Sequence, residues 1–101
     1  MSNIEHIRKY EKSIYDNGMY SELWELAHEL NPWFDIDKVK PWSVYVWTKD
    51  SDDPDGPFGE NVFDICSDHI QFYRINNCWQ MPNEAIPIIM KIQEKLREIG
   101  F

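Results

Sequence analysis

Cys66, His69 and Asp64 are the residues of this chain whose types and spacing could do chemistry. If Ser67 and Asp68 form a two-residue turn, Cys66 and His69 lie directly opposite each other in a hairpin. Their Cβ atoms are then roughly 4.5–5.5 Å apart, so thiol and imidazole can touch. Asp64 lies one pair along on the same face and could orient His69, as in a nucleophile–base–orienter triad. The plainer alternative is that these side chains simply fill a sheet surface.

The same cysteine and histidine side chains are zinc ligands, and Cys78 could join them. The C-x2-C and H-x3-H spacings that identify zinc sites are absent. The acidic stretch 50–60 (DSDDPDGPFGE) contains carboxylates of the kind that bind calcium, but it does not fit the EF-hand loop. Counted from Ser51, position twelve is Val62, where a bidentate Glu is required. The four glycines form no phosphate-binding motif. We therefore expect no catalytic residues, no metal site and no cofactor.

The segment around Cys66 is expected to be β-structure. Residues 43–48 (SVYVWT) are β-branched and aromatic, which is typical of a strand. Residues 61–66 and 69–75 form the hairpin, in which Phe63 pairs with Phe72 and Ile65 with Ile70 on one face. The opposite face carries the polar set: Asp64, Cys66, His69, Gln71 and Tyr73. Residues 76–77, both asparagine, could turn the chain into a further short strand over 78–81.

Helices flank this β-segment. A capping box at Ser2 and Glu5 begins the first helix, which stops at Gly18. A second helix runs from Ser21 to the Asn31–Pro32 pair. A third helix follows residues 82–83 and ends at Gly100. Its apolar stripe consists of Ile88, Ile89, Ile92, Leu96 and Ile99. The order α-α-β-β-β-(β)-α predicts an α+β fold with two layers. We expect an antiparallel three- or four-stranded meander with two N-terminal helices and one C-terminal helix.

Length and composition limit the class of protein. A chain of 101 residues is one domain, spanning residues 1–101. A hydrophobic fraction of 43%, with five residues each of Trp, Tyr and Phe, argues against intrinsic disorder. No apolar run approaches the ~18–20 residues of a membrane span, and no signal-peptide core is visible, so we expect no membrane partner. Two cysteines are too few for a disulfide scaffold, which favours a cytoplasmic location.

Charge is strongly negative and uneven. The formal net charge is −8, the wrong sign for direct binding to nucleic acid. Residues 1–15 and 69–101 each carry a net +1, whereas residues 16–68 hold thirteen acidic residues and three lysines, a net −10. Such a segment would attract a protein with a basic surface.

Aromatic side chains lie close to this charge. Tyr45 and Trp47 point to one face of the strand 43–48, and Val44 and Val46 point to the other. One face should pack under the helices, while the other, which also holds Asp64, stays partly open. Aromatic anchors beside steering charges are typical of protein-binding sites. The predicted partner-binding residues are Tyr45, Trp47, Asp50, Asp52, Asp53, Asp55, Phe58, Asp64 and Tyr73. A chain this small could equally use its aromatic residues to build a core.

The leading hypothesis is a small acidic, non-enzymatic binding protein. It would be an inhibitor or adaptor that docks on the basic surface of, for example, a nucleic-acid-binding protein. In size and charge it is similar to small acidic inhibitors encoded by phages and toxin–immunity cassettes, although this likeness is one of composition alone. Two alternatives stay open: a cysteine/histidine-dependent enzyme or metal-binding protein that uses Cys66, His69 and Asp64, and a homodimer formed through an open sheet edge or face.

Overall fold

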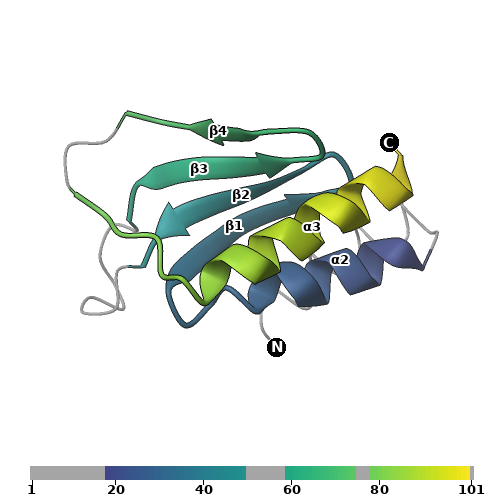
Figure 1. The fold of residues 1–101 in the computed structure, drawn as a ribbon, viewed down its shortest axis with the longest axis horizontal. Helices are drawn as coiled ribbons and strands as arrows, with labels where there is room; N and C mark the ends of the chain where they lie inside the picture. The colour runs from purple at the N-terminus through teal and green to yellow at the C-terminus, as the bar shows by residue number, and fades with distance from the viewer. Residues whose placement is uncertain (1–17, 50–58, 75–77, 101) are drawn as a thin grey trace.

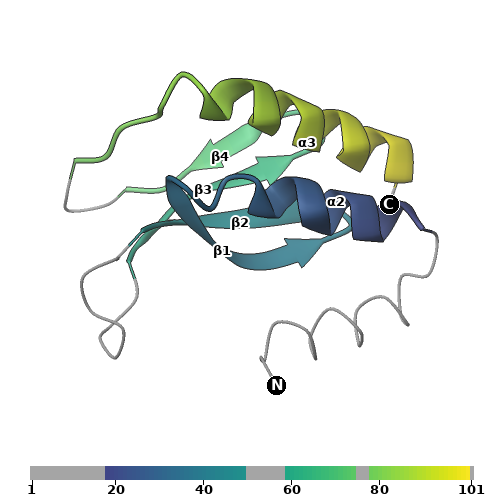
Figure 2. The same cartoon turned by 90° about the horizontal axis from the view of Figure 1, so that it is seen from below.

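Four antiparallel strands form a meander that two helices cover on one face (Figure 1). The computed structural model describes residues 18–49, 59–74 and 78–100. Its elements are α2 (Met19–His28), β1 (Phe34–Lys40), β2 (Ser43–Thr48), β3 (Asn61–Cys66), β4 (Ile70–Phe72) and α3 (Ala85–Ile99). The strand order is β1-β2-β3-β4, and α2 and α3 lie side by side across the sheet (Figure 2). The α+β class and the antiparallel meander are confirmed. One helix precedes the described sheet, and the other N-terminal helix expected over residues 2–17 lies outside the described residues.

The core lies between the sheet and the two helices. On the sheet side its centre is built from β2 and β3, whose inward side chains are fully buried: Val44, Val46, Phe63 and Ile65. Phe34 and Val39 of β1 extend it. The helices bury Leu23 and Ala27 of α2 and Ile89, Ile92 and Leu96 of α3 against them. The apolar stripe expected along the last helix is therefore its buried face.

The β3–β4 hairpin has the expected register. Ile65 pairs with Ile70 and Phe63 with Phe72, and the backbone N–H of Cys66 donates to the carbonyl of His69 at 2.9 Å. Helix α3 reaches this turn with polar side chains: Gln93 Nε2 donates to the carbonyls of Cys66 (3.2 Å) and His69 (3.3 Å). The second strand of the hairpin is shorter than expected, because β4 ends at Phe72.

The expected strand over residues 78–81 is wrong, and the fourth strand lies elsewhere. Residues 78–81 are irregular, and Trp79 packs its ring on Phe63 with centroids 5.6 Å apart. The fourth strand is β1, within residues 33–42, which were assigned no element. The apolar residues Phe34 and Ile36 follow the alternation of a strand, but Val39 comes one position later than that alternation requires. The register of β1 against β2 shifts at the same place, between Ile36 and Lys38. The β-bulge there breaks the period-two pattern that identifies strands.

A glycine with a positive φ angle lies at the start of α2 and another at the end of α3. Gly18 has a φ of 75°, and α2 begins directly after it at Met19, two residues earlier than expected. Gly100 has a φ of 66°, and its N–H donates to the carbonyl of Leu96 at 3.1 Å, which confirms the predicted stop. Within the described ranges, neither helix is long and apolar enough to cross a membrane.

Truncation of Ile92 tests the core. Ile92 is completely buried under the sheet, so Ile92→Ala should lower the free energy of unfolding by about 2–5 kcal/mol. Glu94→Ala, on the exposed side of the same helix, should change it by less than about 0.5 kcal/mol. Urea denaturation followed by circular dichroism measures both values, and equal losses would contradict this packing.

Candidate functional site

The sheet face opposite the helices, called the outer face below, carries the aromatic and acidic residues singled out above. Tyr45 pairs with Asp64 across β2 and β3, so the two side chains share this face. Together with Trp47 and Tyr73 they line a hollow of about 280 Å³, whose remaining described walls are Asp37, Lys38, Lys40 and Asn61. The structure therefore brings together the four predicted partner-binding residues that it describes. The other five, Asp50, Asp52, Asp53, Asp55 and Phe58, lie outside the described residues.

The carboxylate of Asp64 is the buried charge of this hollow. Asp64 is 6% exposed, and its two oxygens accept hydrogen bonds from the Tyr73 hydroxyl and from Asn61 Nδ2, the latter at 3.3 Å. Asn61 Nδ2 also donates to the carbonyl of Val46 at 2.9 Å. A buried carboxylate is stable only when it is hydrogen-bonded, so these partners are what allow an acid in the sheet. The register between β2 and β3 shifts next to Asn61, at the place where the Asn61 side chain approaches Asp64.

The bond to Asp64 changes the acidity of Tyr73. Donation of the hydroxyl proton to the Asp64 carboxylate, followed by partial burial and the nearby negative charge, raises the pKa of Tyr73 to about 12. Loss of that proton would place two anions side by side and break the hydrogen bond. The fold therefore keeps the Tyr73 hydroxyl protonated to a higher pH than that of an ordinary tyrosine.

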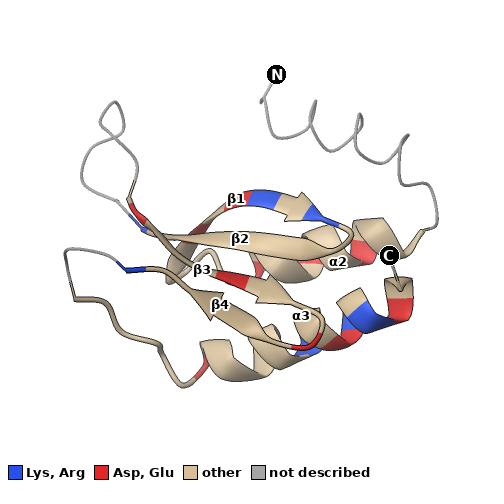
Figure 3. Cartoon of the chain, turned by 90° about the horizontal axis from the view of Figure 1, so that it is seen from above, with Lys and Arg blue, Asp and Glu red and all other residues tan. Residues whose placement is uncertain are grey.

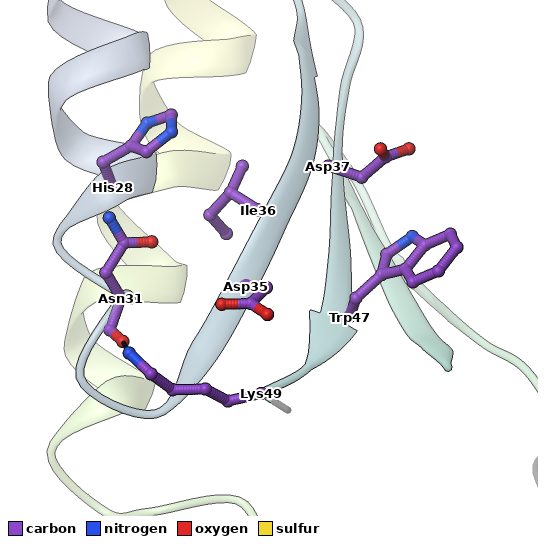
Figure 4. A pocket seen from close by; sticks show the side chains of 7 residues that line it. All are labelled: His28, Asn31, Asp35, Ile36, Asp37, Trp47 and Lys49. Atoms are coloured by element: carbon purple, nitrogen blue, oxygen red, sulfur yellow. Dashed lines mark hydrogen bonds between the residues drawn. The ribbon is translucent and has the colours of Figure 1, made fainter. Parts of the chain in front are cut away.

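A second hollow wraps around the edge of β1. Figure 3 shows acidic residues toward the start of this strand and lysines toward its end. The hollow is about 580 Å³ and is lined by His28, Asn31, Asp35, Ile36, Asp37, Trp47 and Lys49. Asp37 and Trp47 lie on one side of β1, with His28 and Asn31 on the other (Figure 4). Asp37 and Trp47 also line the first hollow, so the two hollows adjoin at these residues.

Two side chains at the rim of this second hollow already have partners. The ammonium of Lys49 donates to the backbone carbonyl of Asn31. The His28 ring lies stacked on Trp24, with centroids 3.9 Å apart, and its Nδ1–H donates to the Trp24 carbonyl at 2.8 Å. The carboxylates of Asp35 and Asp37 are the anionic groups that this hollow offers to a ligand, and the ammonium of Lys49 keeps its positive charge at the rim.

Asp35 and Asp37 are site residues that the sequence reasoning missed. They belong to β1, for which no strand was predicted. The signal that could have found them is the alternation of residues 34–40 (FDIDKVK), interrupted by one extra residue. A bulged residue is often re-aimed toward a site, and Asp37 is that residue here.

Cys66, His69 and Asp64 are not assembled into a triad. His69 Nδ1 contacts the carboxylate of Asp68 at 2.7 Å, and that contact lowers the pKa of Asp68. The Cys66 thiol lies 3.6 Å from the Ser43 hydroxyl, while Asp64 is engaged by its own two partners. Among the residues that the structure describes, no group of three or more His, Cys, Asp or Glu side chains could hold a metal ion.

Replacement of Asp64 tests the hydrogen bond to Tyr73. In Asp64→Asn the acceptor loses its charge, so the pKa of Tyr73 should fall from about 12 toward its ordinary value of 10.0. Tyrosinate absorbance during an alkaline titration measures this, and subtraction of the Tyr73→Phe curve assigns the signal to Tyr73. Superimposable titrations of wild type and Asp64→Asn would contradict the bond.

The same bond has a pH-dependent effect on stability. The folded state raises the pKa of Tyr73. The hydrogen bond to Asp64 therefore contributes fully to the free energy of unfolding below pH 10, and this contribution is lost as the pH rises toward about 12. The difference in unfolding free energy between wild type and Tyr73→Phe should therefore be constant at neutral pH and shrink above pH 10. Urea denaturation at about pH 8 and about pH 11 measures it, with circular dichroism confirming that both proteins are folded.

Comparison with known proteins identifies no relative of this chain. No protein-family model, curated protein or solved structure matches the chain. The functional interpretation therefore rests on the chemistry of the outer face itself.

Proposed function

We propose that this chain is a non-enzymatic binding protein, an inhibitor or adaptor that docks on the basic surface of another protein through its outer face. The observation that carries the proposal is the placement of the Trp47 indole with Asp35 and Asp37 in one hollow of about 580 Å³. An arginine side chain suits such a site, because its planar guanidinium stacks on an aromatic face and donates in pairs to carboxylates.

The neighbouring hollow supplies rigid contact area. Tyr45 and Tyr73 are aromatic residues with few rotatable bonds, and Tyr73 is already fixed by its bond to Asp64. Side chains that are held in place before binding lose little conformational entropy when a partner docks. The lysines of this face, Lys38 and Lys40, belong to the far half of β1, so we assign the contact with basic side chains to the half that holds Asp35 and Asp37.

Long-range charge supports the same proposal. The net −10 of residues 16–68 would steer a cationic protein toward this part of the chain. A nucleic-acid-binding protein has such a surface, and the chain would then compete with phosphates for it. This mode of action is that of a small acidic inhibitor of the kind encoded by phages or immunity cassettes. We do not propose cysteine-based catalysis, because the His69 ring is bonded to Asp68 and not to Asp64 or Cys66.

Binding of a nonaarginine peptide tests the arginine site. Asp37→Asn and Trp47→Ala should each weaken binding about three- to tenfold, through loss of a carboxylate or of the stacking surface. Glu94→Gln on α3 is the matched control, because it removes the same charge as Asp37→Asn from an exposed position on another element. Isothermal titration calorimetry at low salt gives the affinities. Equal affinities of Asp37→Asn and Glu94→Gln would count against the site.

The contribution of the acidic stretch 50–60 to binding is tested by neutralising four of its aspartates. The quadruple variant with Asn at Asp50, Asp52, Asp53 and Asp55 should bind the same peptide more weakly and with a flatter dependence on salt. The control carries Gln at four exposed glutamates elsewhere, Glu29, Glu84, Glu94 and Glu98, and so has the same net charge. Equal losses in the two quadruple variants would show that total charge, and not this stretch, drives the attraction.

A further inference from the structure

The two edges of the sheet differ in how well they are protected against pairing with another strand. The β1 edge carries Asp35, Asp37, Lys38 and Lys40 together with a bulge, which are the features that natural proteins use to block edge pairing. The β4 edge, Ile70–Gln71–Phe72, is only three residues long, but it has no charged residue (Figure 3) and no bulge in its register with β3. Among the described residues, no strand pairs with the outer side of β4.

The backbone of β4 offers hydrogen-bonding groups along this edge. The carbonyl of His69 and the N–H of Tyr73 bond to β3, at 2.9 and 3.0 Å respectively. Successive residues of a strand direct their backbone groups to opposite sides, so the N–H and C=O groups of Ile70 and Phe72 point away from β3. They form a short template for an antiparallel strand.

Exposed apolar side chains accompany this edge. Phe72 is 62% exposed, yet its ring is held by stacking on Trp79, with centroids 6.1 Å apart. On α3, Ile86 and Met90 are 45% and 58% exposed. They lie on the same stripe of the helix as Gln93, which bonds to the carbonyls of the β3–β4 turn, so this stripe faces the β4 side. Large apolar side chains exposed on one side of a molecule are typical of a protein interface.

We propose that a second copy of this chain pairs with the β4 edge, antiparallel, about a two-fold axis that passes beside Gln71. In this register Ile70 of each copy faces Phe72 of the other, and each such pair exchanges both of its N–H···O bonds. Gln71 faces its own counterpart, so no like charges meet at the axis. The edge is therefore self-complementary in backbone groups, in apolar side chains and in charge, as a two-fold interface must be.

Spacing and charge both fit this arrangement. Strands are ~4.8 Å apart, so helices α3 lying over β3 in the two copies would be about 14 Å apart. Helices in direct contact are about 10 Å apart, and the exposed Phe72, Ile86 and Met90 side chains of both copies would fill the difference. The β1 edges, each with two aspartates and two lysines, would lie at the two far ends of the joined sheet, so their charges do not meet at the interface.

The joined sheet would place both outer faces on the same side, because the two-fold axis runs perpendicular to the sheet. The dimer would then present two copies of the hollows around Trp47 to one partner surface. This self-association uses a different edge from the proposed docking of a basic partner and does not depend on it.

Sedimentation equilibrium and directed disulfide formation test the proposal together. Wild type should show twice the 12.2 kDa chain mass at high concentration, and Phe72→Lys should weaken the dimer by at least about tenfold. Asp37→Lys, which puts the same residue on the other edge strand, should leave the dimer intact. Circular dichroism shows whether each variant is folded.

Gln71→Cys, in a background with Cys66 and Cys78 replaced by Ser, tests the register itself. Residue 71 would lie in a non-hydrogen-bonded pair with its counterpart, at a separation that suits a disulfide. Mild oxidation should therefore link Gln71→Cys into a covalent dimer, whereas Lys38→Cys on β1 should form no disulfide-linked dimer. A wild-type monomer at all concentrations, a dimer that survives Phe72→Lys, or equal cross-linking of Gln71→Cys and Lys38→Cys would each overturn the proposal.

Discussion

The buried carboxylate of Asp64 constrains the arrangement of the whole outer face. An unpaired charge in this position would cost several kcal/mol, so both carboxylate oxygens need donors from the protein. One donor, Tyr73, is delivered by the register of the β3–β4 hairpin, and the other, Asn61, lies where the β3 register shifts. A slip of one residue in the hairpin would turn Asp64 into the apolar core beside Val46 and away from Tyr73 and Asn61. Packing and electrostatics therefore select the same strand pairing.

That pairing gives the two faces and the two edges of the sheet different characters. The inner face is apolar and packs against α2 and α3, whose Gln93 also holds the hairpin turn. The outer face combines Tyr45, Trp47 and carboxylates, which suits contact with a cationic surface. At the edges, β1 is charged and bulged while β4 is uncharged, so one edge is available for an acidic docking site and the other for self-pairing.

The strands that could be predicted from the sequence are those whose pattern is uninterrupted. Residues 43–48 alternate cleanly, and the hairpin register followed from sorting Phe63 and Ile65 away from Asp64. Strand β1 was missed because its bulge at Asp37 breaks the alternation, and Asp35 and Asp37 were missed with it. The cysteine–histidine pairing was expected from backbone register alone. It fails at the side-chain level because Asp68, adjacent in sequence, is a closer acceptor for His69 than any group on the neighbouring strand.

The most direct test of docking through the outer face is site-specific photo-crosslinking in a lysate of the source cells. A photoreactive amino acid is placed at Tyr45, on the outer face, or at Glu94, on the exposed side of α3. Docking through the outer face predicts a cross-linked partner of basic isoelectric point from position 45 alone, in a yield that falls as salt is added. Absence of a product at position 45, equal products at both positions, or an acidic partner unaffected by salt would contradict it.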